Sequence, residues 1–283
     1  MKIGILQSAG IAGDIIDIAF NHPEQEEVFT PVVYSKENQN DKNVGSDLKF
    51  GNIAGVVVAP GSATTFNFEG SMEIYIDDAV RLAVAMPGKD APEAAASLSQ
   101  DVLTERVNKA LMSLHRDFLC SVPRIAVIAL NTALDEVEKT VISPAVAALN
   151  EKEYCVFGPY TLDDYIESGK YRSFDLTLVI TDAQAEAFLS KVTADTRTRF
   201  IAGIPMVMAQ TDYPATYAFD KSCLEKPALA LRSAIYHVID ICRCRAQYDE
   251  AHKSPLPKLY HERRDDSEKV RFAIPKKKSE NNS

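Results

Sequence analysis

The sequence predicts an α/β protein built on a mainly parallel β-sheet with helices on both faces. Short segments rich in β-branched residues alternate along the chain with segments whose apolar residues recur at helical spacing. Several strand segments are apolar without a break, as expected when both faces of a sheet are covered. The length of 283 residues allows one large domain or two lobes of ordinary domain size.

The first half of the chain alternates between strand and helix patterns. Continuous apolar runs predict strands over 3–6, 30–34, 53–58 and 79–85. Helical spacing predicts helices over 14–20 and 102–119. Ser97 or Ser99 is the candidate N-cap of the longer helix. Polar, turn-forming residues predict a surface loop over 35–49, and the stretch 62–71 shows no clear period.

The second half continues the same alternation up to a polar tail. Strands are predicted over 125–130, 154–159, 175–180 and 200–208, the last broken by the turn residues 203–205. Helices are predicted over 134–149, 183–191 and 227–248. Residues 1–262 are expected to form one folded unit, and 263–283 to be a disordered basic tail.

Composition argues against several classes of partner. The net charge of −9 disfavours nucleic-acid binding, which requires a basic stripe on the protein, and the one basic run is Lys276 to Lys278. No segment approaches the ~20 apolar residues of a membrane span, and the start resembles no signal peptide, so we expect a cytoplasmic protein. The five scattered cysteines form no disulfide framework.

Ligands of parallel sheets bind where loops leave the carboxyl ends of the strands. The loops to test for chemistry therefore begin at Gln7, Ala59, Met86, Asn131, Thr181 and Ala209. In the first of these, Gly10 and Gly13 lack the full dinucleotide fingerprint, and Asp14 would repel a pyrophosphate at the helix start. No two histidines have metal-ligand spacing on one element, and no serine or cysteine stands in a nucleophile motif.

Carboxylates follow several of the predicted strands. Asp163, Asp182 and Asp212 each come shortly after such a segment, where they could converge on a hard cation such as Mg²⁺. The alternative for Asp182 is a purely structural one, because it opens a predicted helix at the position of an N-cap.

A series of motifs between residues 121 and 248 resembles, in order, those of one enzyme family. The strand 123–131 is similar to the strand before an Asn-Pro-His-Ala-Gly-Glu loop, and 157–160 with Asp163 to a Gly-Pro-x-x-Ala-Asp segment. Residues 174–184 are similar to the run into Tyr-His-Asp-Gln.

Two later segments extend the series. Residues 203–207 with Asp212 resemble the family's motif Gly-Leu-Pro-x-x-Arg-Thr-Ser-x-Asp-His-Gly-Thr. Residues 231–241 resemble the last helix of the same family. Residues 3–13 and 30–34 match more weakly. The family is that of the 4-hydroxythreonine-4-phosphate dehydrogenases of pyridoxal phosphate biosynthesis.

This resemblance implies an architecture of the isocitrate and isopropylmalate dehydrogenase type, with two α/β lobes, a central cleft and a homodimer. It also implies oxidation of a phosphorylated hydroxy-amino acid with NAD and a divalent metal that is held by three histidines. Because the family's active sites draw on both subunits, a heterodimer with an intact family member is the alternative to a homodimer.

The chain departs from the family pattern at the metal-binding positions. The three histidines correspond to Ala133, to Asp182 and to a position near Gly88. Alanine, glycine and one aspartate cannot replace three imidazoles as ligands of a divalent ion.

The phosphate-binding positions are also changed. The family's phosphate arginine corresponds to Met208, and the lysine after its Ala-Pro motif to Ala63. Its Gly-His-Thr-Glu loop has no counterpart in the short stretch between Pro60 and Arg81. The polar residues left as candidate substrate-binding residues are Asn131, Asp163, Asp182 and Asp212.

Our first hypothesis is a catalytically degenerate family member with a binding or regulatory role linked to vitamin B6 biosynthesis, which takes a small molecule in the cleft. The alternative is an active NAD- and metal-dependent dehydrogenase of another hydroxy acid, with Mg²⁺ or Mn²⁺ held by Asp163, Asp182 and Asp212. NAD and a metal are required only under the second hypothesis. An unrelated α/β protein ranks third, since the ordered motifs would then be coincidence.

Overall fold

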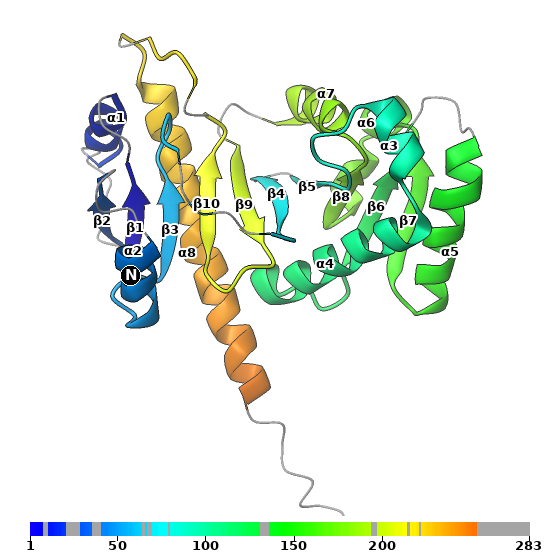
Figure 1. Cartoon of the computed structure of the whole chain (residues 1–283), viewed down its shortest axis with the longest axis horizontal. Coiled ribbons are helices and arrows are strands. Elements are labelled where there is room, and N and C mark those ends of the chain that lie inside the picture. Colours follow the sequence, from blue (N-terminus) through cyan, green and yellow to red (C-terminus); the bar gives the residue numbers. More distant parts are fainter. Residues whose placement is uncertain are drawn as a thin grey trace, which may run out of the picture.

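The computed structural model describes residues 1–7, 11–20, 29–35, 41–63, 66, 69–78, 80–130, 136–193, 197–213, 216–220 and 222–253. Its strands form one ten-stranded sheet in the order β2-β1-β3-β10-β9-β4-β5-β8-β6-β7 (Figure 1). The strands are β1 (Lys2–Leu6), β2 (Thr30–Tyr34), β3 (Gly55–Val58), β4 (Met72–Asp77), β5 (Val80–Val84), β6 (Arg124–Ile128), β7 (Cys155–Tyr160), β8 (Leu176–Val179), β9 (Thr198–Ala202) and β10 (Met208–Thr211).

Helices connect most of these strands. They are α1 (Ile11–Phe20), α2 (Asp41–Lys49), α3 (Ala91–Ser97), α4 (Gln100–Phe118), α5 (Ser143–Glu151), α6 (Leu162–Glu167), α7 (Asp182–Val192) and α8 (Glu225–Lys253), with a π-helical turn η1 (Glu138–Ile142) and a 3-10 turn η2 (Lys170–Ser173). Ser99 is the N-cap of α4, because its hydroxyl accepts the backbone N–H of Val102. None of the helices in the described ranges is both long enough and apolar enough to cross a membrane.

The sheet consists of two parallel halves that run in opposite directions. Strands β2, β1, β3 and β10 are parallel to one another, and so are β5, β8, β6 and β7. Between the halves, β10, β9, β4 and β5 are each antiparallel to the next. The α/β class and the mainly parallel sheet are therefore confirmed, but the halves place their strand ends at opposite edges.

This reversal corrects one expectation from the sequence. The carboxyl ends of β1 and β3 lie at one edge of the sheet, and those of β5 and β8 lie at the other. The carboxyl ends of the strands therefore cannot all meet at one ligand site. The reason is the β9–β10 hairpin and the β4–β5 hairpin, which turn the chain back between the halves.

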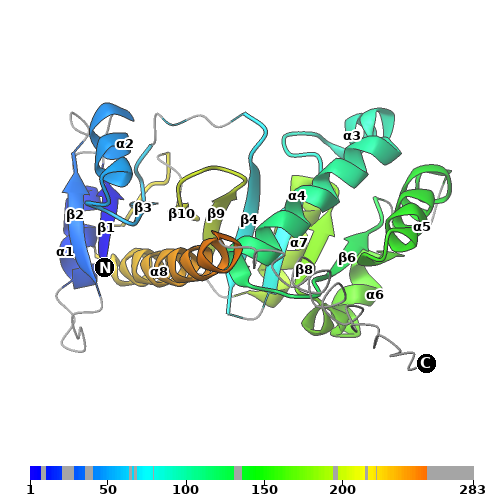
Figure 2. The same cartoon turned by 90° about the horizontal axis from the view of Figure 1, so that it is seen from below.

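Helices cover both faces in each half. Figure 2 shows α2 opposite α1 and α8 in one half, and α4 and α5 opposite α6 and α7 in the other. One apolar core is continuous across the sheet and lies under α1, α8, α4 and α5. The other face has two separate cores, one around Val44 of α2 and one around Phe188 of α7. The two lobes are thus the two ends of the sheet, each of which has its own core on this second face.

Several elements were not expected from the sequence, among them the helices α2, α3 and α6 and the strand β4. Part of the predicted loop 35–49 is the helix α2, whose Val44 is fully buried and whose Leu48 packs beside the same core. Two apolar residues at i and i+4 are too weak a signal among polar neighbours to predict a helix. The strand β4 follows the irregular stretch and buries Met72, Ile74 and Ile76 at the period of two that is typical of a strand.

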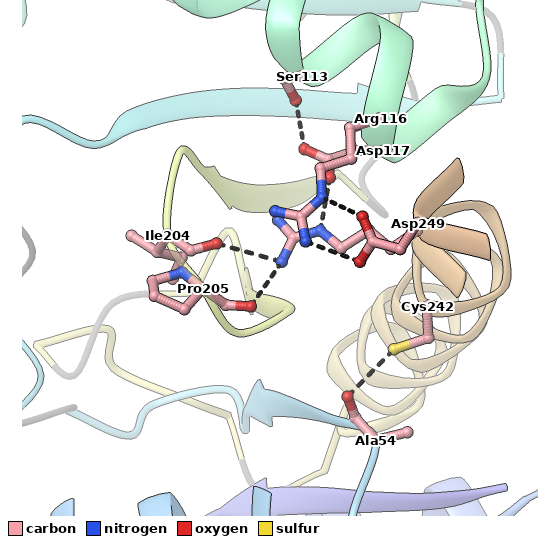
Figure 3. Close-up of polar contacts among 9 residues, drawn as sticks. Ala54, Ser113, Arg116, Asp117, Ile204, Pro205, Cys242 and Asp249 are labelled. Atoms are coloured by element: carbon pink, nitrogen blue, oxygen red, sulfur yellow. Dashed lines mark hydrogen bonds and ion pairs between the residues drawn. The ribbon is translucent and has the colours of Figure 1, made fainter. Parts of the chain in front are cut away.

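A buried ion pair attaches the long helix α8 to α4. The guanidinium Nε of Arg245 donates to Asp117 Oδ1 at 2.5 Å, and Ser113 Oγ donates to the other oxygen of this carboxylate at 2.6 Å. Arg245 Nη1 also donates to the carbonyl oxygens of Ile204 and Pro205, at 3.2 Å each (Figure 3). One arginine therefore links two helices and the turn between β9 and β10.

Close to this ion pair, α8 packs directly on β3. The thiol of Cys242 is buried and donates to the carbonyl oxygen of Ala54 at 3.4 Å (Figure 3). Burial raises the pKa of this thiol to about 12. In contrast, Cys223 is exposed.

We expect iodoacetamide at mildly alkaline pH to alkylate Cys223 and to leave Cys242 unmodified in the folded protein. A pKa of about 12 instead of 9.0 reduces the thiolate population of Cys242 about 10³-fold, and burial further restricts access. Peptide mass spectrometry after timed alkylation measures both sites, and alkylation in denaturant is the control. Equal rates in the folded protein would show that α8 does not pack on β3 as described.

Candidate ligand-binding site

A polar cavity of about 390 Å³ lies where β4 begins and β5 ends. Glu73, Tyr75 and Arg199 line it from the face of the sheet with the two separate cores, and Arg106 reaches it from α4, which covers the other face. Its apolar lining comes from Met72, Val84 and Pro87. Its polar lining consists of Ser71, Glu73, Tyr75, Arg106, Asp182 and Arg199.

Strand alternation explains why β4 and β9 carry polar side chains here. Ile74 and Ile76 face the continuous core, so the intervening Glu73 and Tyr75 point to the other face. Tyr75 is the direct cross-strand neighbour of Arg199 on β9. The cavity is therefore built on the antiparallel strands at the junction of the two halves of the sheet.

Arg199 is only partly satisfied by its neighbours. Its Nη1 lies 3.6 Å from Glu73 Oε2, and its Nη2 donates to Gln210 Oε1 at 3.4 Å. Its Nε is buried without a hydrogen-bond partner, 3.9 Å from the nearer oxygen of Asp212. Since an unsatisfied buried donor is costly, this side chain is available for an additional acceptor.

Asp212 belongs to an arginine cluster beside the cavity. Its Oδ2 is 2.7 Å from Arg197 Nη2, while Arg199 approaches its other oxygen. Burial raises the pKa of Asp212, and this effect is larger than the opposing effects of Arg197 and Arg199. The carboxylate is thus paired mainly with Arg197, while Arg199 lies between Asp212 at 3.9 Å and Glu73 at 3.6 Å.

Two further donors of the cavity have no hydrogen-bond partner among the residues that the structure describes. Arg106 is half-buried on α4 and forms no hydrogen bond or ion pair with any residue the structure describes. Tyr75 is also half-buried, and burial raises the pKa of its hydroxyl, although Arg199 partly opposes this. At neutral pH the tyrosine is therefore a neutral hydrogen-bond donor next to two arginines.

The N-terminus of α7 completes the cavity. Thr181 is its N-cap and forms a capping box with Gln184, which corrects the alternative in which Asp182 was the cap. Asp182 is instead the first helical residue, and its Oδ2 accepts the backbone N–H of Gly88 at 2.6 Å. This contact ties the loop after β5 to the start of α7.

Gln184 fixes the ends of neighbouring strands. Its Nε2 donates to the carbonyl oxygens of Ala129 and Leu130, at 2.6 and 3.2 Å. Its Oε1 accepts the N–H groups of Ile180 and Thr181 at 2.9 and 3.3 Å. In this chain the glutamine therefore has a structural role at the edge of the cavity.

The candidate residues from the sequence are dispersed. Asp163 is exposed and forms an ion pair with Lys191 in the last turn of α7, whereas Asp182 is in the first turn, about 13 Å away along the helix. Asp212 follows β10, in the oppositely directed half of the sheet from the strand β8 that precedes Asp182. Asn131 lies outside the described residues.

A divalent metal does not fit the residues of this cavity. Within the described ranges, no three histidine, cysteine, aspartate or glutamate side chains are grouped so that they could hold a metal ion. Asp182 is already engaged by Gly88, and Glu73 by Arg199. Two guanidinium groups would also repel a divalent cation.

The sequence did not identify the arginines and the tyrosine of the cavity. They lie on different elements, α4, β4 and β9, that only the folded sheet brings together. The one local signal was the charged residue Arg199, which comes directly before the predicted apolar strand 200–208.

Comparison with known proteins places these features in a family context. The family model described as pyridoxal phosphate biosynthetic protein PdxA matches residues 48–236. A 4-hydroxythreonine-4-phosphate dehydrogenase from Bacteroides thetaiotaomicron is 29% identical over 212 residues, which are 73% of this chain and 58% of that protein. One from Prosthecochloris aestuarii is 29% identical over 132 residues, 44% of this chain and 38% of that protein.

The matched region thus spans little more than half the length of the first of these curated relatives. In solved structures, a 4-hydroxythreonine-4-phosphate dehydrogenase from Burkholderia phymatum superposes with a TM-score of 0.64. The superposition covers 83% of this chain and 98% of that one at 14% identity, so this likeness is one of fold.

Proposed function

Because the chain belongs to the family of the pyridoxal phosphate biosynthetic protein PdxA, we propose that it is a divergent member with a binding or regulatory role. In this proposal the central cavity takes a small anionic metabolite, and the chain does not catalyse metal-dependent dehydrogenation. The link to vitamin B6 biosynthesis rests on the family.

The observation that carries this proposal is the contact between Asp182 and Gly88. The motif resemblance aligns Asp182 with one of the family's metal-binding histidines and puts a second near Gly88, while the third corresponds to Ala133, outside the described residues. Here Asp182 and Gly88 are joined by a hydrogen bond of 2.6 Å. One carboxylate that already accepts a backbone amide does not make a ligand set, because a divalent cation needs several ligands and the described residues group no three acidic, histidine or cysteine side chains there.

The two arginines of the cavity support an anionic ligand, although Glu73 and Asp182 in the same lining balance their charge. Arg106 has no partner among the described residues and Arg199 has an unsatisfied Nε, so both can donate to a carboxylate or phosphate. The positive end of the α7 dipole also points to this region, although Asp182 reduces its effect. A ligand with two acidic groups could engage both arginines.

The decisive experiment combines an activity assay with a binding assay on the purified protein. We expect no NADH from 4-hydroxythreonine 4-phosphate and NAD, with or without Mg²⁺, Mn²⁺ or Zn²⁺, because the metal ligands are not assembled. The dehydrogenase from Bacteroides thetaiotaomicron serves as the positive control. Metal-dependent NADH formation would overturn the proposal and would favour the alternative of an active dehydrogenase.

The binding part uses inorganic phosphate and malate as probes in isothermal titration. We expect at least one to bind, and Arg106→Met or Arg199→Met to weaken it about tenfold or more, the loss typical of a charge-assisted hydrogen bond. Arg172→Met, an exposed arginine on η2, is the matched control. If neither probe binds, or if Arg172→Met has the same effect as Arg106→Met, the anion site is wrong.

A further inference from the structure

A second cavity, of about 270 Å³, lies at the other end of the β4–β5 hairpin. It is open on one side and is bordered by the β4–β5 hairpin, by the C-terminal end of α4 and by one side of α8. The two cavities have no lining residue in common. Ligand binding in the second cavity is therefore independent of the proposed function of the first.

Arg81 on β5 is the cationic group of this second cavity. Its guanidinium carbon lies 4.4 Å from the centre of the Phe118 ring, so the group is stacked on the end of α4. Its Nε is buried and has no hydrogen-bond partner, and it forms no ion pair with any described residue. Stacking thus fixes the position of the arginine but leaves its directional donors unused.

Carboxylates surround this arginine at a greater distance. Asp77 and Asp78 at the hairpin and Asp240 on α8 all line the cavity, and Asp240 also forms an exposed ion pair with Arg243 at 3.4 Å. Asp117 also contributes to the lining, but it is committed to Arg245. The C-terminal end of α4 adds partial negative charge. The mouth of the cavity therefore carries negative charge, and the guanidinium group of Arg81 is the one positive charge among its described lining residues.

One wall of the cavity is a single face of α8. His237, Asp240, Ile241 and Cys244 follow one another at i, i+3, i+4 and i+7, the spacing of one helix face. His237 Nδ1 lies 2.9 Å from Thr198 Oγ1, which orients the ring and leaves Nε2 without a described partner. Burial lowers the pKa of His237, although Asp78 and Asp240 oppose this, so the ring is neutral at neutral pH.

We propose that this second cavity binds a small zwitterion of the α-amino acid type. The ligand carboxylate pairs with Arg81, and its ammonium group lies among Asp78 and Asp240. A simple anion would satisfy the arginine but would face the carboxylates. A simple cation would satisfy the carboxylates but would leave Arg81 unpaired and be repelled by it. Only a ligand with both charges meets both requirements.

Ligand-observed NMR with the common L-amino acids tests this proposal on the full chain. We expect at least one to bind with a Kd of about 1 mM or lower. For that amino acid, the amine that lacks the carboxylate and the hydroxy acid that lacks the ammonium group should each bind at least about tenfold more weakly. If none of the amino acids binds, or if both single-charge analogues bind equally well, the proposal is wrong.

Variants assign the binding to this cavity. Arg81→Met retains an apolar stem on Phe118 and should abolish binding, while Asp78→Asn, an exposed position that tolerates change, should weaken it several-fold. Arg172→Met is again the matched control and should bind as the parent chain does. Unchanged affinity in both Arg81→Met and Asp78→Asn would place the amino acid elsewhere and overturn the assignment.

Discussion

Replacing Arg245 with methionine is expected to lower the free energy of unfolding by about 3–5 kcal/mol. Asp117 would then be a charged group with 3% of its side chain exposed and without its cation, and the carbonyl oxygens of Ile204 and Pro205 would lose a donor. Only the hydroxyl of Ser113 would still bind the carboxylate. Denaturant unfolding followed by circular dichroism measures the loss.

A second arginine–aspartate pair between the same two helices provides the control. Arg116 binds Asp249 with two hydrogen bonds, of 3.2 and 3.0 Å (Figure 3), but their side chains are 38% and 45% exposed. Exposed pairs contribute at most about 1 kcal/mol, so Arg116→Met should have a small effect. A loss in Arg245→Met no larger than in Arg116→Met would show that the buried pair is not the anchor of α8.

Substituting Gly158 with alanine is the second change for which we expect a large effect, about 3 kcal/mol of lost stability. This residue of β7 has a φ of +131°, a conformation that side chains rarely adopt. A Cβ atom would also press on the carbonyl oxygen of Val127 in the neighbouring strand β6. The obstacle is backbone within a sheet, so it cannot move aside as a flexible side chain could.

Gly45 is the matched control for this substitution. It lies in α2, and a Cβ atom added there would meet nothing within 4 Å. Since alanine favours a helix over glycine by about 1 kcal/mol, Gly45→Ala should be neutral or stabilising. Thermal unfolding of the two variants side by side measures both effects. A Gly158→Ala protein as stable as the parent would mean that the pairing of β6 with β7 differs from that described.

Local patterns in the sequence were sufficient for most of the secondary structure. Continuous apolar runs predicted β1, β3, β6 and β8, and helical spacing predicted α4 and α8, because a buried strand or an amphipathic helix is recorded in consecutive residues. The family motifs were also local, and the family is confirmed. Elements with few apolar residues, such as α2, were missed because they are held by a neighbouring core and not by their own pattern.

The candidate site could not be predicted in the same way. Arg199 and Tyr75 are neighbours only because β9 pairs with β4, and Arg106 reaches the same cavity from α4. Likewise, Arg81 and Phe118 meet only because α4 packs on the hairpin of β4 and β5. Carboxylates that follow strands were a reasonable local signal, but Asp163 and Asp182 lie at opposite ends of α7, and Asp212 is paired with Arg197.

The sequence by itself therefore determined the α/β class, the position of most strands and helices, and the family. The tertiary structure decided which strand ends share an edge, which side chains enter the two cavities, and that Asp182 satisfies Gly88. The physical reason is that apolar periodicity is set by neighbours in the chain, whereas strand order and the convergence of charges depend on pairings between residues far apart in it.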